Sequence, residues 1–145
     1  MIVRKLEIED IAQAAKVYID SYSKNPWDEE YDIKKVEDHL HRFISSDINI
    51  GWVIISNMEV VGVSLGYKVA CIGSDYFMIE DFCIRPDMQG MGLGQYFIKE
   101  LSSNLKLEDI SCIMLNTVKG FPAYTFYIKN GFTEVKSSAI LSLEI

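Results

Sequence analysis

The sequence predicts a mixed α/β fold in which helices cover both faces of a central sheet. A short strand and two helical patterns come first, three strand-like runs follow, and helix and strand then alternate. This order favours a layered sheet of about six or seven strands with about four helices. The chain has 145 residues, so we expect a single domain over residues 1–145.

The first part of the chain supplies one strand and two helices. Residues 2–6 are predicted as a short strand, and residues 8–21 place apolar side chains at helical spacing. The inward positions of that helix are Ile11, Ala14, Ala15, Tyr18 and Ile19. Pro26 breaks the pattern, and Asp28 can cap a second helix that runs to about Ile44.

Strands dominate the middle of the chain. Residues 51–56 and Glu59–Val69 are rich in β-branched side chains, and Ser56-Asn57 suits a hairpin turn between them. Tyr76–Ile84 is a third run, which ends at Arg85-Pro86. We therefore expect three consecutive strands of the central sheet here.

The last third alternates between helix and strand. Residues 92–105 are predicted as a helix, residues 112–117 as a strand, Pro122–Lys129 as a helix and residues 132–143 as a closing strand. Pro122 suits a first helical turn because its missing N–H would have no partner there. Gly131 suits the position just past the helix end.

The charge and the cysteines narrow the function classes. The net charge of −7 argues against nucleic acid, whose phosphates need a basic face. An acidic surface attracts cations such as amines, although it also serves solubility alone. Cys71, Cys83 and Cys112 are odd in number and widely spaced, so neither disulfides nor a metal site are indicated. We therefore expect the protein to work in a reducing cytoplasm.

Membrane insertion and export are not indicated by the residues present. No apolar run approaches about 18 residues, the length that a spanning helix needs. The N-terminal segment MIVRKLEIED has mixed charge and lacks the apolar stretch of a signal peptide.

A glycine-rich run after the third middle strand is the most informative segment. It contains Gly90, Gly92 and Gly94 at the start of a predicted helix, where unpaired N–H groups and the helix dipole favour an anion. The spacing fits neither a dinucleotide G-x-G-x-x-G nor a nucleoside-triphosphate loop, which needs G-K-S/T. A pyrophosphate site is one interpretation, and a tight turn with close helix packing is the other.

Two blocks carry a resemblance to a known family. The run Gln89 to Gly94 resembles the Q/R-x-x-G-x-G/A motif of the GNAT N-acetyltransferases, and a strand ending in Ile84-Arg85-Pro86-Asp87 precedes it. The segment FPAYTFYIKNGF resembles the family's A-x-x-F-Y-x-x-x-G-F signature through Ala123, Phe126, Tyr127, Gly131 and Phe132. The resemblance implies a mostly antiparallel GNAT-like sheet and an acyltransferase that uses acetyl-CoA.

The resemblance also implies where acetyl-CoA binds. In the family, the loop amides hold the pyrophosphate, which corresponds here to Gln89, Gly90, Met91, Gly92, Leu93, Gly94 and Gln95. The pantetheine arm pairs with the preceding strand like an added strand, which corresponds to Phe82, Cys83 and Ile84. The family's usual asparagine three residues before the alanine is replaced by Gly120, and Asn116 is the candidate to substitute for it.

Catalysis by this resemblance needs an acid and a base. Tyr127 matches the tyrosine that protonates the departing thiolate, and Tyr124 is its competitor. An alkyl amine is mostly protonated at neutral pH, a shortfall of roughly 4–5 kcal/mol that favours a base. Glu80 and Asp81 precede the pantetheine strand, and one of them should point into the cleft because strand side chains alternate. The alternative is a solvated edge or an ion pair.

The sequence indicates only the chemical class of the molecule that accepts the acetyl group. The stretch IEDFCIRPDMQGMGLG resembles the diamine and polyamine acetyltransferases of the family, in which an acidic pair contacts the cationic substrate. Tyr22, Trp27 and Tyr31 could line the acceptor pocket by cation–π contact, or they could pack a loop against the sheet. A small-molecule amine is the expected acceptor.

Several alternatives to that function stay open. The chain could instead acetylate a protein N-terminus or lysine, or use a longer acyl-CoA. It could also be a non-catalytic acyl-CoA-binding module. A homodimer formed through the terminal strand is a further implication of the resemblance.

Overall fold

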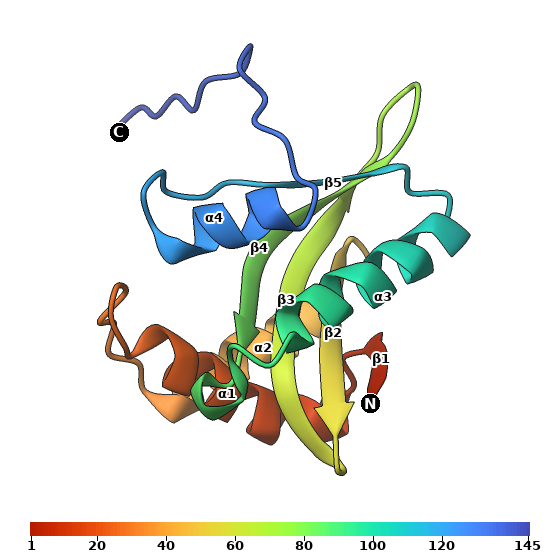
Figure 1. Ribbon diagram of the computed structural model, residues 1–145. Coiled ribbons are helices and arrows are strands. Elements are labelled where there is room, and N and C mark those ends of the chain that lie inside the picture. The colour runs from red at the N-terminus through yellow and green to blue at the C-terminus, as the bar shows by residue number, and fades with distance from the viewer.

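A computed structural model describes residues 1–145 and contains one five-stranded sheet in the order β1-β2-β3-β4-β5. The strands are β1 (Ile2–Lys5), β2 (Asn49–Ser56), β3 (Glu59–Val69), β4 (Tyr76–Ile84) and β5 (Cys112–Leu115). The first four strands are antiparallel, and β5 runs parallel to β4. The fold is therefore the mixed, mostly antiparallel α/β arrangement that the sequence predicts (Figure 1).

Helices cover both faces of this sheet. The helices are α1 (Ile11–Tyr22), α2 (Ile33–Ile44), α3 (Leu93–Leu107) and α4 (Pro122–Lys129), with short 3-10 turns at Ile8–Asp10 and Pro86–Met88. One buried cluster joins α1 and α2 to one face, and a second joins α3 and Tyr127 of α4 to the other face (Figure 1). Alternation along the strands divides the apolar residues between these clusters; on β2, Val53 faces one and Ile54 the other.

A β-bulge interrupts β4 at Glu80. Leu65 of β3 lies opposite Asp81, but its neighbour Gly66 lies opposite Ile79, so Glu80 is an extra residue on β4. The bulge reverses which residues face which side. Ile79 packs in the α3 cluster, and without the extra residue Asp81 would face that side too; instead Asp81 lies on the α1 face.

The strands β4 and β5 separate beyond the bulge. Their parallel ladder joins Tyr76–Ile79 to Cys112–Leu115 and ends there. β4 continues to Ile84 while remaining paired with β3. Residues 81–84 therefore have an unpaired edge on the β5 side, and the glycine-rich loop follows directly (Figure 1).

The closing strand predicted over residues 132–143 is absent, which leaves five strands where six or seven were expected. After α4 the chain crosses beside β5 and ends away from the sheet (Figure 1). A strand forms only when a neighbour accepts its hydrogen bonds, and local β-propensity does not supply that neighbour.

Two boundaries were also wrong. Asp28 has a φ of 49°, outside the extended region that a helix cap adopts, and the second helix begins only at Ile33. Asp32 caps it instead, accepting a hydrogen bond from the main-chain N–H of Lys35. The hairpin turn falls one residue later than predicted, at Asn57-Met58, where both residues have positive φ.

None of the four helices combines the length and the apolar character that a membrane-spanning helix requires.

Candidate active site

The unpaired edge of β4 presents main-chain groups to the space between β4 and β5. The N–H of Arg85 donates to the carbonyl of Val61 on β3 at 2.8 Å. Because adjacent residues of an antiparallel strand direct their main-chain groups to opposite sides, Phe82 and Ile84 direct theirs to the open side. The Ile84 carbonyl accepts from Gln89 Nε2 at 2.8 Å, which ties the following loop to the strand end.

The loop from Gly90 to Gln95 offers a run of free donors. None of its six main-chain N–H groups donates to another main-chain group. Gly92 caps α3 in a left-handed conformation without any side-chain cap, and its carbonyl accepts from Tyr96 N at 3.0 Å. The positive end of the α3 dipole adds to these donors, so the loop is suited to bind an anion with several oxygens.

The three loop glycines serve two different purposes. Gly90 and Gly92 have φ values of 77° and 80°, and a Cβ added to either would meet no atom within 4 Å. They keep the approach to the amides open and allow the left-handed turn. A Cβ on Gly94 would lie 3.0 Å from the ring of Phe126, so this glycine lets α3 pack against α4. Both interpretations of the glycine run therefore apply, at different positions.

Tyr127 is held as a neutral phenol beside the open edge. Its side chain is buried, and its ring lies 6.3 Å from that of Phe82 and 5.3 Å from that of Phe132. Burial raises the pKa of Tyr127 well above its ordinary value, and Cys83 and Asp81 add to the effect. The hydroxyl thus keeps its proton at neutral pH and can donate it only to a strong acceptor.

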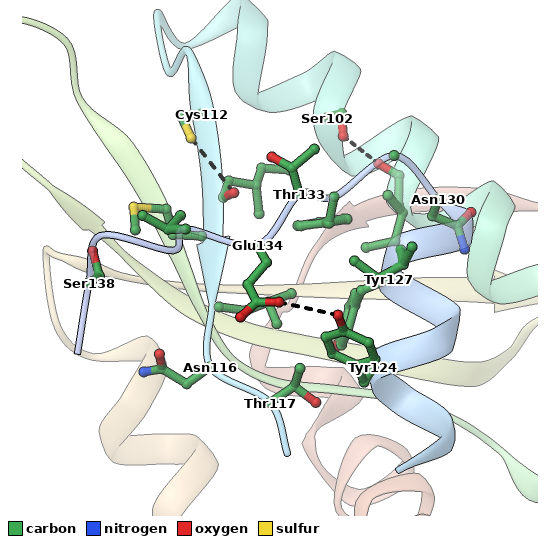
Figure 2. A pocket seen from close by; sticks show the side chains of 18 of the residues that line it. Ser102, Cys112, Asn116, Thr117, Tyr124, Tyr127, Asn130, Thr133, Glu134 and Ser138 are labelled. Carbon is green, nitrogen blue, oxygen red and sulfur yellow. Dashed lines mark hydrogen bonds between the residues drawn. The ribbon is translucent and has the colours of Figure 1, made fainter. Parts of the chain in front are cut away.

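The competing tyrosine is engaged elsewhere. The Tyr124 hydroxyl donates to the Glu134 carboxylate at 3.4 Å (Figure 2). Lys119 pairs with the same carboxylate. These groups belong to the side of α4 that faces the C-terminal segment. Of these two tyrosines, Tyr127 is therefore the one that lies beside Phe82 of β4.

The two acidic residues before the open edge differ in their surroundings. Glu80, the bulged residue, is exposed and forms no ion pair. Asp81 is half-buried and accepts a hydrogen bond from Tyr18 Oη at 3.2 Å. Burial raises the pKa of Asp81 above its ordinary value, and the nearby Tyr22 and Tyr18 hydroxyls limit that rise. Asp81 is thus the carboxylate held against α1, and Glu80 faces solvent.

An aromatic row leads away from Asp81. The ring of Tyr22 lies 4.6 Å from Tyr18 and 5.9 Å from Trp27, whose ring lies 5.4 Å from Phe121 at the start of α4. Tyr31 packs edge-on against Tyr18 at 5.6 Å. The segment between α1 and α2 therefore reaches the N-terminal end of α4. Tyr18 and Phe121 were not predicted as site residues, although Tyr18 stands one helical turn before Tyr22, which could have indicated it.

The thiol of Cys83 is not set up as a nucleophile. Cys83 lies in the core under α1, and burial raises the pKa of its thiol to about 12. A thiol with that pKa carries almost no thiolate at neutral pH. The chain also offers no cluster of His, Cys, Asp or Glu side chains that could hold a metal ion.

A second open space lies on the other side of β5. It has a volume of about 1160 Å³ between α3, β5, α4 and the C-terminal segment, and Asn116 and Tyr127 both line it (Figure 2). The residues 82–95 do not line it. Gly120, in the family's asparagine position, has a φ of 86° and open space around it. Asn116 follows directly after β5. It therefore lies on the β5 side of the fork, the space where β4 and β5 separate, and across from the glycine-rich loop.

These features define an acyltransferase: a forked sheet, a loop of free amides at the fork and a neutral tyrosine beside it. The sequence profile described as "Acetyltransferase (GNAT) domain" matches residues 47–134, more than half of the chain. The chain belongs to the GNAT acetyltransferases and is an acyltransferase enzyme. A comparison with curated protein sequences gives no match.

Solved structures share the fold across nearly the whole chain. A GNAT family acetyltransferase from Staphylococcus aureus is 17% identical with a TM-score of 0.77, covering 98% of each chain. An aminoglycoside acetyltransferase from an uncultured soil metagenomic sample, in complex with sisomicin, is 13% identical with a TM-score of 0.78, covering 99% of this chain and 95% of that one. An aminoglycoside 6'-N-acetyltransferase from Acinetobacter haemolyticus is 9% identical with a TM-score of 0.77, covering 100% and 99%. At these identities the likeness shows the fold alone.

Proposed function

We propose that residues 1–145 act as one domain that transfers the acetyl group of acetyl-CoA to a primary amine of a small molecule. The observation that carries this proposal is the run of unpaired N–H groups from Gly90 to Gln95, placed where β4 leaves β5. A diphosphate bears several oxygens that such donors can bind together. The GNAT family uses acetyl-CoA, which carries a diphosphate of this kind.

The co-substrate fits the open edge in two parts. Gln89, Gly90, Met91, Gly92, Leu93, Gly94 and Gln95 would hold the diphosphate. Along Phe82, Cys83 and Ile84, the pantetheine amides would pair with the main-chain groups of Phe82 and Ile84, which face the open side, as an added strand does. Asn116, on the opposite branch of the fork, would take the place of the family's usual asparagine. Tyr127 would then lie beside the thioester.

The transfer needs no covalent intermediate on the protein. The acceptor arrives as an ammonium ion and gives one proton to the carboxylate pair, with Asp81 nearer the cleft and Glu80 nearer solvent. The amine nitrogen forms the C–N bond and releases its second proton to solvent water, a strand N–H steadies the oxyanion, and the C–S bond breaks. Tyr127 gives its proton to the sulfur and regains one from solvent.

The acceptor side favours a cation. Asp81 and Glu80 supply negative charge, and Tyr22 and Trp27 supply aromatic faces that attract ammonium groups. A diamine or polyamine suits this combination. Two solved relatives are described as aminoglycoside acetyltransferases, so amine-bearing sugars belong among the candidates.

An amine-panel assay tests the proposal. Purified protein would be mixed with acetyl-CoA, a thiol reagent and one amine at a time, from small diamines and spermidine to aminoglycosides and lysine-containing peptides. We expect thiol release that depends on a small cationic amine, with mass spectrometry showing the acetylated product. CoA binding without amine-dependent thiol release would favour a non-catalytic module, and acetylation of peptides alone would move the acceptor class to proteins.

We also propose that two copies of the chain form a dimer through the C-terminal segment. We further propose that the protein works in a reducing cytoplasm. β5 is an edge strand, and the segment beside it exposes Ile140, Leu141 and Leu143. Apolar residues next to an unpaired edge favour pairing with a second chain. The three thiols are unpaired, as suits that compartment. Sedimentation of the full chain against one ending at Ser138 tests the pairing: a dimer that becomes a monomer is expected, and a monomeric full chain would contradict it.

A further inference from the structure

Two phenols of α1 converge on one carboxylate of β4. Tyr18 Oη donates to Asp81 Oδ1 at 3.2 Å, and Tyr22, one helical turn later, lies close enough to lower the pKa of the same carboxylate. Their rings pack against each other with centroids 4.6 Å apart. The two packed rings therefore form the α1 side of the surroundings of Asp81.

The carboxylate lacks the partner that buried acids usually have. Asp10, which is more deeply buried than Asp81, is bridged by the Arg4 guanidinium with contacts of 2.6 and 2.9 Å. Asp81 takes part in no ion pair. Its negative charge is steadied by phenols, which are neutral, and so it stays available to a cation from outside.

The bulge at Glu80 explains why this carboxylate reaches α1. The extra residue turns Asp81 away from the face that Ile79 occupies and toward Tyr18. Asp81 thus ends beside the open half of β4 and one residue before Phe82, whose main-chain groups face the fork. A bulge next to a site commonly aims a side chain in this way.

We infer that Tyr18 and Tyr22 are positioning residues that hold Asp81 ionised and oriented, so that it can receive the cationic acceptor and its proton. The inference rests on the proposed amine acetylation, to which it adds the residues that prepare the acceptor's carboxylate. A phenol that donates to a carboxylate favours its ionised form and fixes the direction of its free lone pairs.

The electrostatic surroundings agree with this role. Burial acts to raise the pKa of Asp81, Tyr22 and Tyr18 act to lower it, His39 lowers it and Glu29 raises it. The titratable groups that face Asp81 are Tyr18 and Tyr22 of α1, Glu29 and Tyr31 of the following segment, His39 of α2, Cys83 of β4 and Tyr127 of α4. Without the two phenols, burial would keep Asp81 protonated to a higher pH, where it could not act as a base.

The test compares Tyr18→Phe, Tyr22→Phe and the double variant with Tyr76→Phe, a matched control at the far end of β4. Carbon-13 NMR titration of the Asp81 carboxyl and the pH profile of kcat/KM for a cationic amine would be measured together. We expect the carboxyl pKa and the acid limb of the profile to move upward by about one pH unit in the double variant. The control should leave both unchanged, and matching unfolding midpoints would show that all variants are folded.

The outcomes separate this inference from the proposed function. The positioning role is overturned if neither the pKa of the Asp81 carboxyl nor the acid limb of the kcat/KM profile shifts in the double variant. If the wild-type chain acetylates no amine, the proposed function fails, and the NMR titration still decides whether the phenols hold Asp81. If Asp81→Asn keeps full kcat/KM for an amine that the wild type acetylates, Asp81 is not the acceptor's carboxylate and the inference fails.

Discussion

The two halves of β4 are built for different tasks although one strand carries both. Tyr76–Ile79 is hydrogen-bonded to β3 on one side and to β5 on the other. Residues 81–84 are hydrogen-bonded only to β3, and their other edge faces the fork between β4 and β5. The closed half anchors the sheet, and the open half exposes main-chain groups that a ligand can use.

A single extra residue, Glu80, divides these halves. On the closed side, Phe77 and Ile79 fill the core under α3; on the open side, Asp81 turns toward α1. The comparison teaches that a bulge can place a polar side chain beside a site while the strand stays in the sheet. Three substitutions would break or sharpen this contrast.

Gly66→Ala should break the closed half and have the largest effect. Gly66 lies opposite Ile79 at the bulge, and an added Cβ would lie 2.4 Å from the Met78 carbonyl oxygen and from the Phe77 ring. The backbone cannot move away cheaply, so we expect a loss of about 3 kcal/mol in the free energy of unfolding. Chemical denaturation measures it, with Gly73→Ala, which meets no atom within 4 Å, as the control. Equal stability of the two variants would contradict the packing described.

Tyr127→Phe should damage the open half without loosening the fold. None of the side-chain hydrogen bonds of the protein involves the Tyr127 hydroxyl, so its removal leaves no partner unsatisfied. Loss of a general acid should lower kcat about 100-fold, which corresponds to about 2.7 kcal/mol in the barrier. Steady-state kinetics with unfolding curves checks this. Tyr124→Phe is the matched control, and a larger loss there would exchange the two roles.

Ser64→Ala should have the smallest effect and sharpens the contrast. Ser64 lies opposite Phe82 on the open half, is fully buried, and its hydroxyl has no hydrogen-bond partner. Removing an unsatisfied buried hydroxyl should leave stability unchanged or raise it by up to about 1 kcal/mol. Thermal unfolding would show it. A clear loss of stability would mean that this hydroxyl has a partner, such as a buried water.

Local patterns predicted much of the fold. The bounds of β3, β4 and α4 agree with the sequence because their signals, apolar strand-like runs and Pro122, act within their own segments. The open, left-handed geometry at Gly90 and Gly92 also follows from the local glycine pattern. That this loop binds acetyl-CoA stays a prediction.

Features that depend on distant partners could not be predicted in the same way. The bulge at Glu80 is a matter of register between β3 and β4, and the contact of Tyr18 with Asp81 joins residues far apart in sequence. The closing strand was wrong for the same reason: residues 132–143 have suitable side chains, but pairing needs a neighbour that the local sequence does not name.

Titration calorimetry of CoA tests the central claim, the grip of the loop amides on a diphosphate, most directly. Gly92→Asn and Gly92→Asp have the same shape and tolerate the left-handed conformation, and an added Cβ has open space there. The aspartate adds a negative charge that competes for the same N–H groups. The account predicts clear binding to the wild type and affinity at least about tenfold weaker for the aspartate than for the asparagine variant, about 1.4 kcal/mol. No heat of association with the wild type, or equal affinity for the two variants, would contradict it.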